Sequence, residues 1–261
     1  MSESVKGRVS IIGLGPGAEG AVTPDAQAAL SAAQDIIGYG PYVARVPLRP
    51  DQERHASDNR VEIERARHAL DLASGGRRVA VVSSGDPGVF AMAAAVYEAL
   101  EADPARWAGV AITVVPGITA MLAAAARLGA PLGHDFCAIN LSDNLKPWEI
   151  VEKRLRHAAR GDFAMAFYNP SSRSRPWQFA RTLAILREEC GPDTVIVFAR
   201  NVTRDDESFA ITTLGEAKPE QADMRTVVIV GSSLTRLIPR GDDRPIVYTP
   251  RWSGTPPEGA E

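Results

Sequence analysis

The segment Ser83–Phe90, SSGDPGVF, places one carboxylate on a backbone that carries few side chains. Asp86 stands between Gly85 and Pro87, directly after an apolar run that is typical of a buried strand. A carboxylate at the end of a strand can accept a hydrogen bond from a ribose hydroxyl or an amine, or act as a general base. It can equally cap the helix that follows. The residues alone leave both roles open.

The glycine-rich segment Val9–Gly20, VSIIGLGPGAEG, invites comparison with a dinucleotide-binding loop. In that motif the helix begins inside the glycines, so that the pyrophosphate lies on the helix N-terminus. Here the first good helix start is Thr23–Pro24, about two helical turns later. The ribose-binding acid should end the second strand, but the one candidate, Asp35, begins it. A nicotinamide-dependent oxidoreductase is therefore disfavoured.

The same loop also departs from the common methyltransferase loop, which carries an acidic residue two positions before its first glycine. Ile11 occupies that position here, and Pro16 removes an N–H from the middle of the loop. What remains is a rigid turn without side chains, against which a flat or bulky ligand could pack. A turn that only leads the chain out of the strand, without any ligand, would have the same kind of sequence.

Composition narrows the class of partner. The 261 residues carry a net charge of −3 and are 45% hydrophobic, so no overall field favours nucleic acid or a membrane surface. Cys137 and Cys190 form no CxxC pair, which favours reduced thiols in the cytoplasm. The four histidines match no ligand spacing, so no metal site is predicted. The N-terminus lacks the apolar region of a secretion signal, and no apolar run is long enough to span a membrane.

The elements that must position these loops alternate between strands and helices. Apolar runs that end in glycine, proline or polar residues predict strands at 8–13, 34–40, 78–83, 110–115, 136–142, 163–168, 194–201, 208–214 and 226–231. Helical periodicity with capping residues predicts helices at 23–33, 57–76, 89–102, 118–129, 147–161 and 175–191. Ser57 or Asp58 should open the second of these helices.

This alternation predicts an α/β protein with mainly parallel sheets. Because the pattern restarts near Pro131, we expect an N-terminal α/β domain at 1–117 and a C-terminal α/β domain at 118–240, with a flexible tail at 241–261. A single open sheet is the alternative. Ligands of parallel sheets collect at the carboxyl ends of strands, so the loops to examine are 13–20, 83–90, 115–120, 168–177 and 200–206.

Taken together, these loops resemble those of the tetrapyrrole methylase family. The resemblance rests on GLGPG, GDPG and PGITA after the first, third and fourth strands, on FYNPSS and on the closing TVVIVG, from Val9 to Gly231. It implies the fold of the class III methyltransferases: two α/β domains, with the active site in the cleft between them. S-adenosyl-L-methionine is the implied methyl donor and S-adenosyl-L-homocysteine the product. Family members are usually homodimers.

The resemblance also implies cofactor-binding positions, since each family loop can be matched residue by residue. Thr119 begins a helix and could serve there only as its cap. Asn169 replaces a frequent methionine, and Val202 stands where some relatives have glycine. The matched cofactor positions are Pro16, Gly85, Asp86, Val89, Thr119, Ala120, Tyr168, Asn169 and Val202.

Within the family, GYGPYV, SDNRVEIERA and YNPSSRSRPWQ are most similar to enzymes of cobalamin (vitamin B12) biosynthesis that methylate carbon 17. Such relatives tend to carry Thr-Gly-Met at 57–59, where this chain has Ser-Asp-Asn. The implied reaction is methyl transfer to precorrin-3B with ring contraction to precorrin-4, in which carbon 20 leaves as an acetyl group. Methyl transfer needs alignment more than acid or base, whereas contraction needs a base near a tertiary hydroxyl. The candidate bases are Asp86, Asp143, Tyr168 and His134.

The implied substrate is a polycarboxylate, so a locally basic site is expected despite the net negative charge. Lys146, Arg173 and Arg175 are the predicted contacts, with Arg45 and Arg60 as further candidates, because a guanidinium fork suits a carboxylate. Transient hand-off to neighbouring pathway enzymes is a further expectation. Two alternatives stay open: the cobalt-factor III enzyme of the anaerobic route, whose cobalt arrives within the substrate, and a carrier that binds a tetrapyrrole without catalysis.

Overall fold

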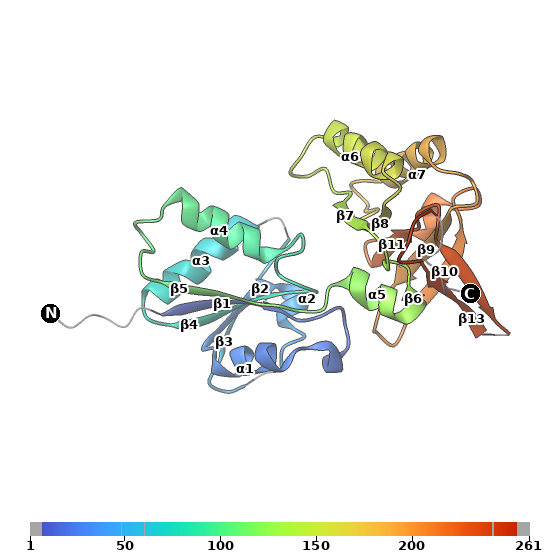
Figure 1. The fold of residues 1–261 in the computed structure, drawn as a ribbon. Helices are drawn as coiled ribbons and strands as arrows, with labels where there is room; N and C mark the ends of the chain where they lie inside the picture. The colour runs from blue at the N-terminus through green and yellow to red at the C-terminus, as the bar shows by residue number, and fades with distance from the viewer. Residues whose placement is uncertain (1–6, 48, 60, 242, 255–261) are drawn as a thin grey trace. The chain divides into compact units, whose positions relative to one another are not determined.

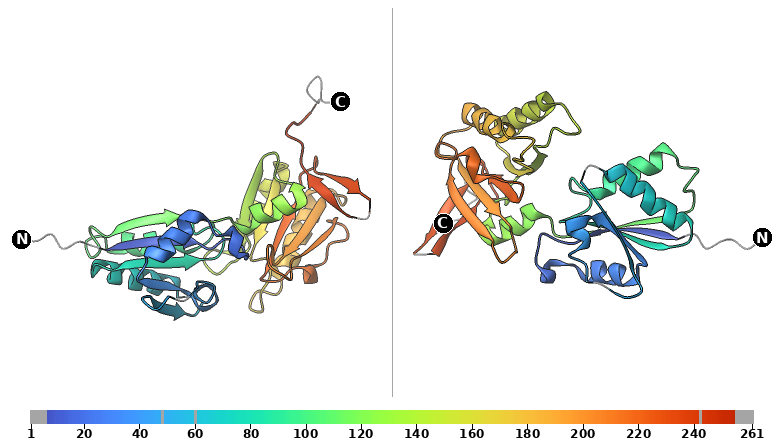
Figure 2. Two further views of the ribbon diagram at one scale, coloured as in Figure 1. Left: turned by 90° about the horizontal axis from the view of Figure 1, so that it is seen from below. Right: turned by 180° about the vertical axis from the view of Figure 1, so that it is seen from behind.

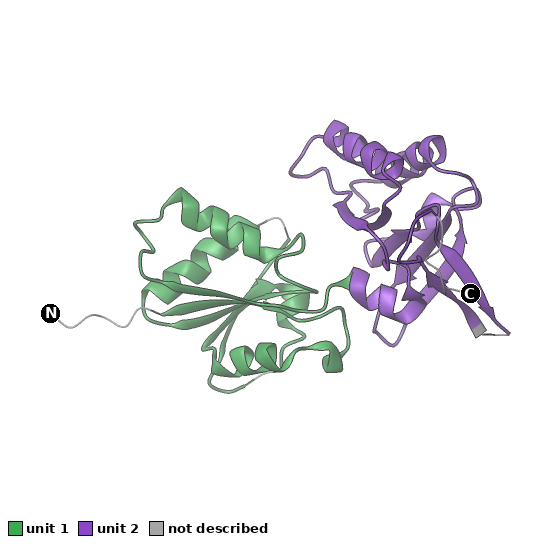
Figure 3. Cartoon of the chain, in the orientation of Figure 1, with its two compact units in different colours: residues 1–120 green, residues 121–261 purple. Residues whose placement is uncertain are grey.

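The computed structural model describes residues 7–47, 49–59, 61–241 and 243–254 (Figure 1). The chain divides into two compact units, residues 1–120 and 121–261 (Figure 3). Residues 118–120, which we expected in the second half, thus belong to the first unit. The structure describes Cys137 and Cys190 as free thiols. None of the described helices has the length and apolar character to span a membrane.

Unit 1 contains one sheet of five parallel strands in the order β3-β2-β4-β1-β5. The strands are β1 Arg8–Gly13, β2 Asp35–Tyr39, β3 Glu53–Ser57, β4 Arg78–Ser83 and β5 Ala111–Val115. Strands β1 and β4 lie in the middle and are covered on both faces, which explains their continuous apolar runs.

Helices cover both faces of this sheet (Figures 1 and 2). α3 Glu62–Ser74 and α4 Met92–Ala102 pack with β1 and β4 side chains such as Ile11 and Val81. On the other face, α1 Pro24–Ala32 and α2 Gly40–Val43 pack with Ile12 and Val82. A short 3₁₀ helix, η1 Glu19–Ala21, precedes α1. The unit therefore has the expected α/β architecture, with its loops at the strand ends.

Unit 2 is built around a mixed sheet in the order β10-β9-β11-β8-β7. Its strands are β7 Phe136–Asn140, β8 Ala164–Tyr168, β9 Val195–Arg200, β10 Ser208–Thr213 and β11 Thr226–Val230. β7 and β8 are parallel, but β11 is antiparallel to β8 and β9, and β10 is antiparallel to β9. β9 and β10 are joined by a loop rather than a helix, which permits an antiparallel pair. Its helices are α5 Ala120–Leu128, α6 Trp148–Arg160 and α7 Gln178–Glu189, with 3₁₀ helix η2 Pro219–Gln221.

A second, three-stranded sheet completes unit 2. β12 Arg236–Arg240 pairs antiparallel with β13 Asp243–Tyr248, which in turn pairs parallel with β6 Gly129–Ala130. β13 therefore occupies part of the segment that we expected to be a flexible tail. Each strand of the hairpin contains a proline, which weakens the sequence signal for a strand. Residues 255–261 of the expected tail lie outside the described residues.

The start of α3 departs furthest from the predicted helix boundaries. Ser57 does not open α3 but ends β3, an edge strand of mostly polar residues that the apolar pattern could not reveal. Its hydroxyl accepts a hydrogen bond from Nε of Arg65. α3 begins instead after Val61. By contrast, Thr23 caps α1 as predicted, because its Oγ1 accepts from the N–H of Ala26.

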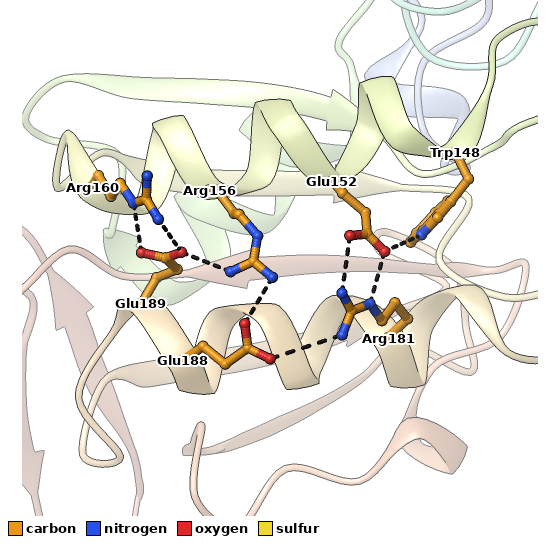
Figure 4. Close-up of polar contacts among 7 residues, drawn as sticks. All are labelled: Trp148, Glu152, Arg156, Arg160, Arg181, Glu188 and Glu189. Carbon is orange, nitrogen blue, oxygen red and sulfur yellow. Dashed lines mark hydrogen bonds and ion pairs between the residues drawn. The ribbon is translucent and has the colours of Figure 1, made fainter.

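Ion pairs join α6 to α7 in unit 2 (Figure 4). Arg181 forms two hydrogen bonds with Glu152, at 2.7 and 3.0 Å. Glu189 accepts from Arg160 at 2.8 and 2.9 Å and from Arg156 at 2.7 Å. These hydrogen bonds from Arg160 and Arg156 lower the pKa of Glu189 to about 2. The two helices are thus held by carboxylates that must stay ionised.

The Glu189 pairs predict a loss of stability in acid. The folded-state pKa lies below the ordinary value of 4.5, so the stabilisation is present above pH 4.5 and is lost as the pH falls toward 2. The variant Glu189→Gln lacks this stabilisation at every pH, because its amide does not ionise. We expect the urea midpoint of the unaltered chain to fall more steeply than that of the variant between pH 5 and pH 2. Glu98→Gln, at an exposed position on α4, should keep the steep dependence. Parallel curves for Glu189→Gln and the unaltered chain would contradict this.

Candidate functional site

Three loops meet at the carboxyl edge of the unit 1 sheet. The first loop follows β1, the second follows β4 and the third follows β5. These three parallel strands are neighbours in the sheet, in the order β4-β1-β5, so their loops lie side by side. Gly15 and Gly85 exchange two backbone hydrogen bonds, with N···O distances of 3.2 and 2.9 Å. Both glycines have a φ of +65°, a conformation that other residues rarely adopt. The first two loops are therefore joined through their main chains.

The third loop approaches the other two equally closely. A Cβ on Gly117 would lie 2.2 Å from the carbonyl oxygen of Gly85 and 2.8 Å from Cα of Gly13. A Cβ on Gly13 would lie 2.6 Å from the same oxygen. Only glycine fits at these positions, because main chain faces main chain.

Asp86 fastens the second loop to the third. Its Oδ1 accepts from the N–H of Gly88 at 2.8 Å, and its Oδ2 accepts from the N–H of Gly117 at 3.0 Å. Both carboxylate oxygens are therefore engaged by backbone. This arrangement agrees with a structural role more directly than with that of a base.

Arg45 differs from the expectation that it contacts substrate. Its Nη2 donates to the carbonyl oxygens of Leu14, Gly15 and Gly17 at 2.7, 3.3 and 3.4 Å. Its Nη1 donates to Oγ of Ser84 at 3.3 Å. The guanidinium braces the first loop rather than presenting a free fork. Arg60, the other extra candidate, lies outside the described residues.

The remaining unit 1 candidates frame this edge. Pro16 and Thr119 are buried, Val89 and Ala120 are half-buried, and the apolar side chains of Phe90 and Ile118 are exposed. A backbone with few side chains and with apolar neighbours suits a ligand held by main-chain groups and apolar contact. The guanidinium of Arg45, which contacts the loop after β1, is bound to carbonyl oxygens rather than presented to a phosphate.

In unit 2, too, the loops that follow parallel strands lie at one edge of a sheet. β7, β8 and β9 run in one direction, since β11 is antiparallel to both β8 and β9. Their carboxyl ends therefore share one edge, with the loops 141–147, 169–177 and 201–207. Asn169, Asn201 and Thr203 have φ values of 52°, 49° and 70°. Such backbone strain in non-glycine residues is concentrated at functional sites.

Tyr168 and Asn169 are held by contacts within unit 2. The Tyr168 hydroxyl accepts from the N–H of Met121 at 3.0 Å, at the start of α5. The Asn169 amide donates to Oδ1 of Asn140 at 3.1 Å. Val202 is buried, so a ligand there would meet main chain rather than the side chain. Contact of these three residues with a cofactor stays a prediction.

Arg173 and Arg175, predicted as a pair, lie in different environments. Arg173 is exposed, whereas Arg175 is only 4% exposed. Nη1 of Arg175 donates to the carbonyl oxygens of Asn169 and Leu141 at 2.9 and 3.3 Å. Burial lowers the pKa of its guanidinium. Arg175 thus closes its own loop, and its expected contact with a substrate carboxylate does not fit this placement.

Asp143, Lys146 and Gln178 form a polar cluster at this edge. Nε2 of Gln178 donates to Oδ2 of Asp143 at 3.0 Å, and Nζ of Lys146 donates to the carbonyl oxygen of Ser142 at 2.7 Å. Burial lowers the pKa of Lys146, and the charge of Arg154 lowers it further. Gln178 was missed as a site residue, although it ends the quoted segment YNPSSRSRPWQ. Its Oε1 is buried and has no hydrogen-bond partner among the described residues.

His134 lies at the wrong edge for a base. It directly precedes the residue before β7, at the amino end of that strand, whereas the loops above follow carboxyl ends. Its Nδ1 accepts from the N–H of Asp135 at 2.6 Å. It therefore lies at the entry to β7 and away from the loops that follow the carboxyl ends.

A separate charged cluster lies at the amino ends of β2 and β3. Asp35, Glu53 and His55 are the one group of potential metal donors found in the described ranges. Arg77 donates to both oxygens of the buried Asp35, at 2.5 and 2.9 Å, and His55 lies 2.9 Å from Oδ1. Burial alone would raise the pKa of Asp35, but the bonds from Arg77 and His55 outweigh it and hold the pKa low. This is an ion-pair cluster whose carboxylate is already satisfied by a guanidinium.

The glycine contact predicts a large effect of one methyl group. Gly117→Ala should force the loops apart and lower the free energy of unfolding by about 1–3 kcal/mol, as overpacking does. Gly20→Ala is the matched control, because a Cβ there meets nothing within 4 Å. It should change the value by less than about 0.5 kcal/mol. Urea unfolding measures both. Equal stability of the two variants would refute the close approach.

Comparison with known proteins gives consistent matches over nearly the whole chain. The family model described as Tetrapyrrole (Corrin/Porphyrin) Methylases matches residues 8–218. The precorrin-3B C(17)-methyltransferase of Sinorhizobium sp is 52% identical over 246 residues, 94% of this chain and 97% of that protein. The probable cobalt-factor III C(17)-methyltransferase of Salmonella typhimurium is 40% identical over 87% of this chain and 93% of that protein. The crystal structure of the methyltransferase CobJ matches with 64% identity and a TM-score of 0.89, over 94% of this chain and all of that one.

Proposed function

Because the chain belongs to the tetrapyrrole (corrin/porphyrin) methylase family, we propose that it is an S-adenosyl-L-methionine-dependent precorrin-3B C(17)-methyltransferase of cobalamin biosynthesis. The observation that carries the proposal is the 52% identity to an enzyme of that name over almost the full length of both chains. The glycine-lined edge of unit 1 supports the cofactor assignment, since it offers main-chain groups and apolar surface rather than a phosphate cradle.

Unit 1 binds the methyl donor through the loops that carry Pro16, Gly85, Val89 and Thr119. When bound, S-adenosyl-L-methionine supplies an electrophilic methyl group on a sulfonium. The chain's own contribution to that transfer is alignment, for which a rigid backbone site is well suited. Asp86 serves this alignment by holding the second and third loops together.

Unit 2 carries the acid–base and substrate contacts. Asp143 is the base that we propose for ring contraction, because its carboxylate is oriented by Gln178 through one oxygen, Oδ2. Asp86 is less suited, since backbone N–H groups engage both of its oxygens. Asp143 would accept the proton of the tertiary hydroxyl, and the exposed Arg173 would pair with a substrate carboxylate. A homodimer, hand-off to neighbouring enzymes and a cytoplasmic location stay predictions.

Ligand binding and turnover test the function directly. We expect isothermal calorimetry to detect S-adenosyl-L-homocysteine, and we expect metal-free precorrin-3B with S-adenosyl-L-methionine to give a methylated, ring-contracted product by mass spectrometry. Faster turnover of cobalt-factor III would assign the chain to the anaerobic route instead. Absence of calorimetric heat from folded protein, with retained tetrapyrrole binding, would identify a carrier.

The base assignment predicts a selective defect. Asp143→Asn should lower kcat for the contracted product by about 10²–10⁴-fold, because it removes the proton acceptor. The affinity for S-adenosyl-L-homocysteine should stay within about twofold. Asp135→Asn is the matched control, since that carboxylate is 84% exposed and precedes β7 at the opposite edge. Unchanged contraction by Asp143→Asn, with a loss in Tyr168→Phe, would transfer the role to the tyrosine.

A further inference from the structure

Large apolar side chains are exposed where the carboxyl-edge loops of unit 2 enter α6 and α7. Leu145 is 99% exposed, Trp177 is 49% exposed and Ile150 on α6 is 41% exposed. Leu145 lies in the loop after β7, and Trp177 is the N-cap of α7. The hydrogen bond between Asp143 and Gln178 joins the segments that carry Leu145 and Trp177. Contiguous exposed apolar patches commonly mark the surface that contacts a ligand or a partner.

The indole of Trp177 is fixed rather than loose. Its ring lies edge to face against Trp148, with 5.1 Å between centroids and an interplanar angle of 74°. Nε1 of Trp148 donates to Glu152 at 2.8 Å, and Glu152 is in turn held by Arg181 (Figure 4). The backbone N–H of Arg181 donates to the carbonyl oxygen of Trp177 at 3.0 Å. The ion pairs between α6 and α7 therefore hold an exposed aromatic ring in place, which lowers the entropic cost of binding on it.

Positive charge lies beside this apolar surface. Lys146 follows Leu145 directly in the chain. Burial lowers the pKa of Lys146, and the positive charges of Arg154 and Arg175 lower it further. Asp143, the carboxylate that opposes this repulsion, is hydrogen-bonded to Gln178, the neighbour of Trp177. An apolar face next to an excess of cations fits a ligand that is a broad ring with carboxylates at its periphery.

We propose that Leu145 and Trp177 form a platform on which the face of a polycarboxylate tetrapyrrole packs, while Lys146 pairs with one of its peripheral carboxylates. The Leu145–Trp177 platform rests on the proposed function for its substrate class and gives that substrate a place on unit 2. Trp177 supplies ring contact, Leu145 extends it along the loop, and Lys146 sets the orientation through charge.

Binding of uroporphyrin I, an octacarboxylate porphyrin, to the full chain tests the platform by fluorescence anisotropy of the porphyrin. Trp177→Ala and Leu145→Ser should each raise Kd about tenfold, and Trp177→Phe should restore most of the affinity because an aromatic face is kept. Lys146→Met should raise Kd about tenfold and weaken the salt dependence. Tyr97→Ala on α4 and Leu237→Ser on β12 remove apolar groups that are 46% and 43% exposed, close to the 49% of Trp177, and should leave Kd within twofold.

Calorimetry with S-adenosyl-L-homocysteine and light scattering separate the outcomes. Unchanged nucleoside affinity in Trp177→Ala, together with weakened porphyrin binding, supports the platform. Porphyrin binding that survives both Trp177→Ala and Leu145→Ser overturns it and leaves the proposed function intact. A dimer that becomes a monomer in Trp177→Ala also overturns it, since the surface would then face a second copy. If the unaltered chain binds neither ligand, the proposed function itself fails.

Discussion

The contact of three strand ends through bare main chain is the constraint on which unit 1 depends. Gly13, Gly85 and Gly117 stand so close that a Cβ on Gly13 or Gly117 would collide with backbone. Adjacent parallel strands bring these three loops together at one edge, so the sheet order β4-β1-β5 serves the site as well as the core. The loops have backbone groups that no strand pairs with. Asp86 accepts from one such N–H, that of Gly117, and Arg45 donates to one such carbonyl oxygen, that of Leu14.

In unit 2 the loops at the sheet edge are held by side chains rather than by close contacts of main chain. Arg175 closes its loop by donating to carbonyl oxygens, Asn169 reaches Asn140, and Gln178 orients Asp143. Buried polar groups of this kind are costly unless each finds a partner, and they fix one geometry when they do. The edge that we assign to substrate chemistry is thus more polar than the edge that we assign to the cofactor.

Sequence reasoning succeeded where burial imposes a pattern. Strands such as β1 and β4 are covered on both faces, so their apolar runs are continuous and their glycine-rich ends stand out. It failed for β3, whose polar residues lie at the edge of a sheet, and for the proline-containing hairpin of β12 and β13.

The site was harder to predict than the fold. Asp86 was singled out as a candidate, yet its bond to the N–H of Gly117 could not be foreseen, since that residue is remote in sequence. Arg45 and Arg175 have the residue type of substrate contacts, but their acceptors are carbonyl oxygens, which every residue possesses and no pattern marks. Gln178 gave no signal of its own, because its role depends on the turn that brings Asp143 to it.

The pairing of β13 with β6 affects the order in which the two units fold during synthesis. Val247 lies beside Gly129, so one sheet of unit 2 joins the segment after α5 to a strand near residue 248. Unit 1 needs nothing beyond residue 120 for its internal contacts. During synthesis it can therefore finish folding on the ribosome, whereas the three-stranded sheet of unit 2 can be completed only after β13 has left the exit tunnel. Until then β6 lacks its partner strand, and an unpaired strand edge is the kind of surface that chaperones protect during folding.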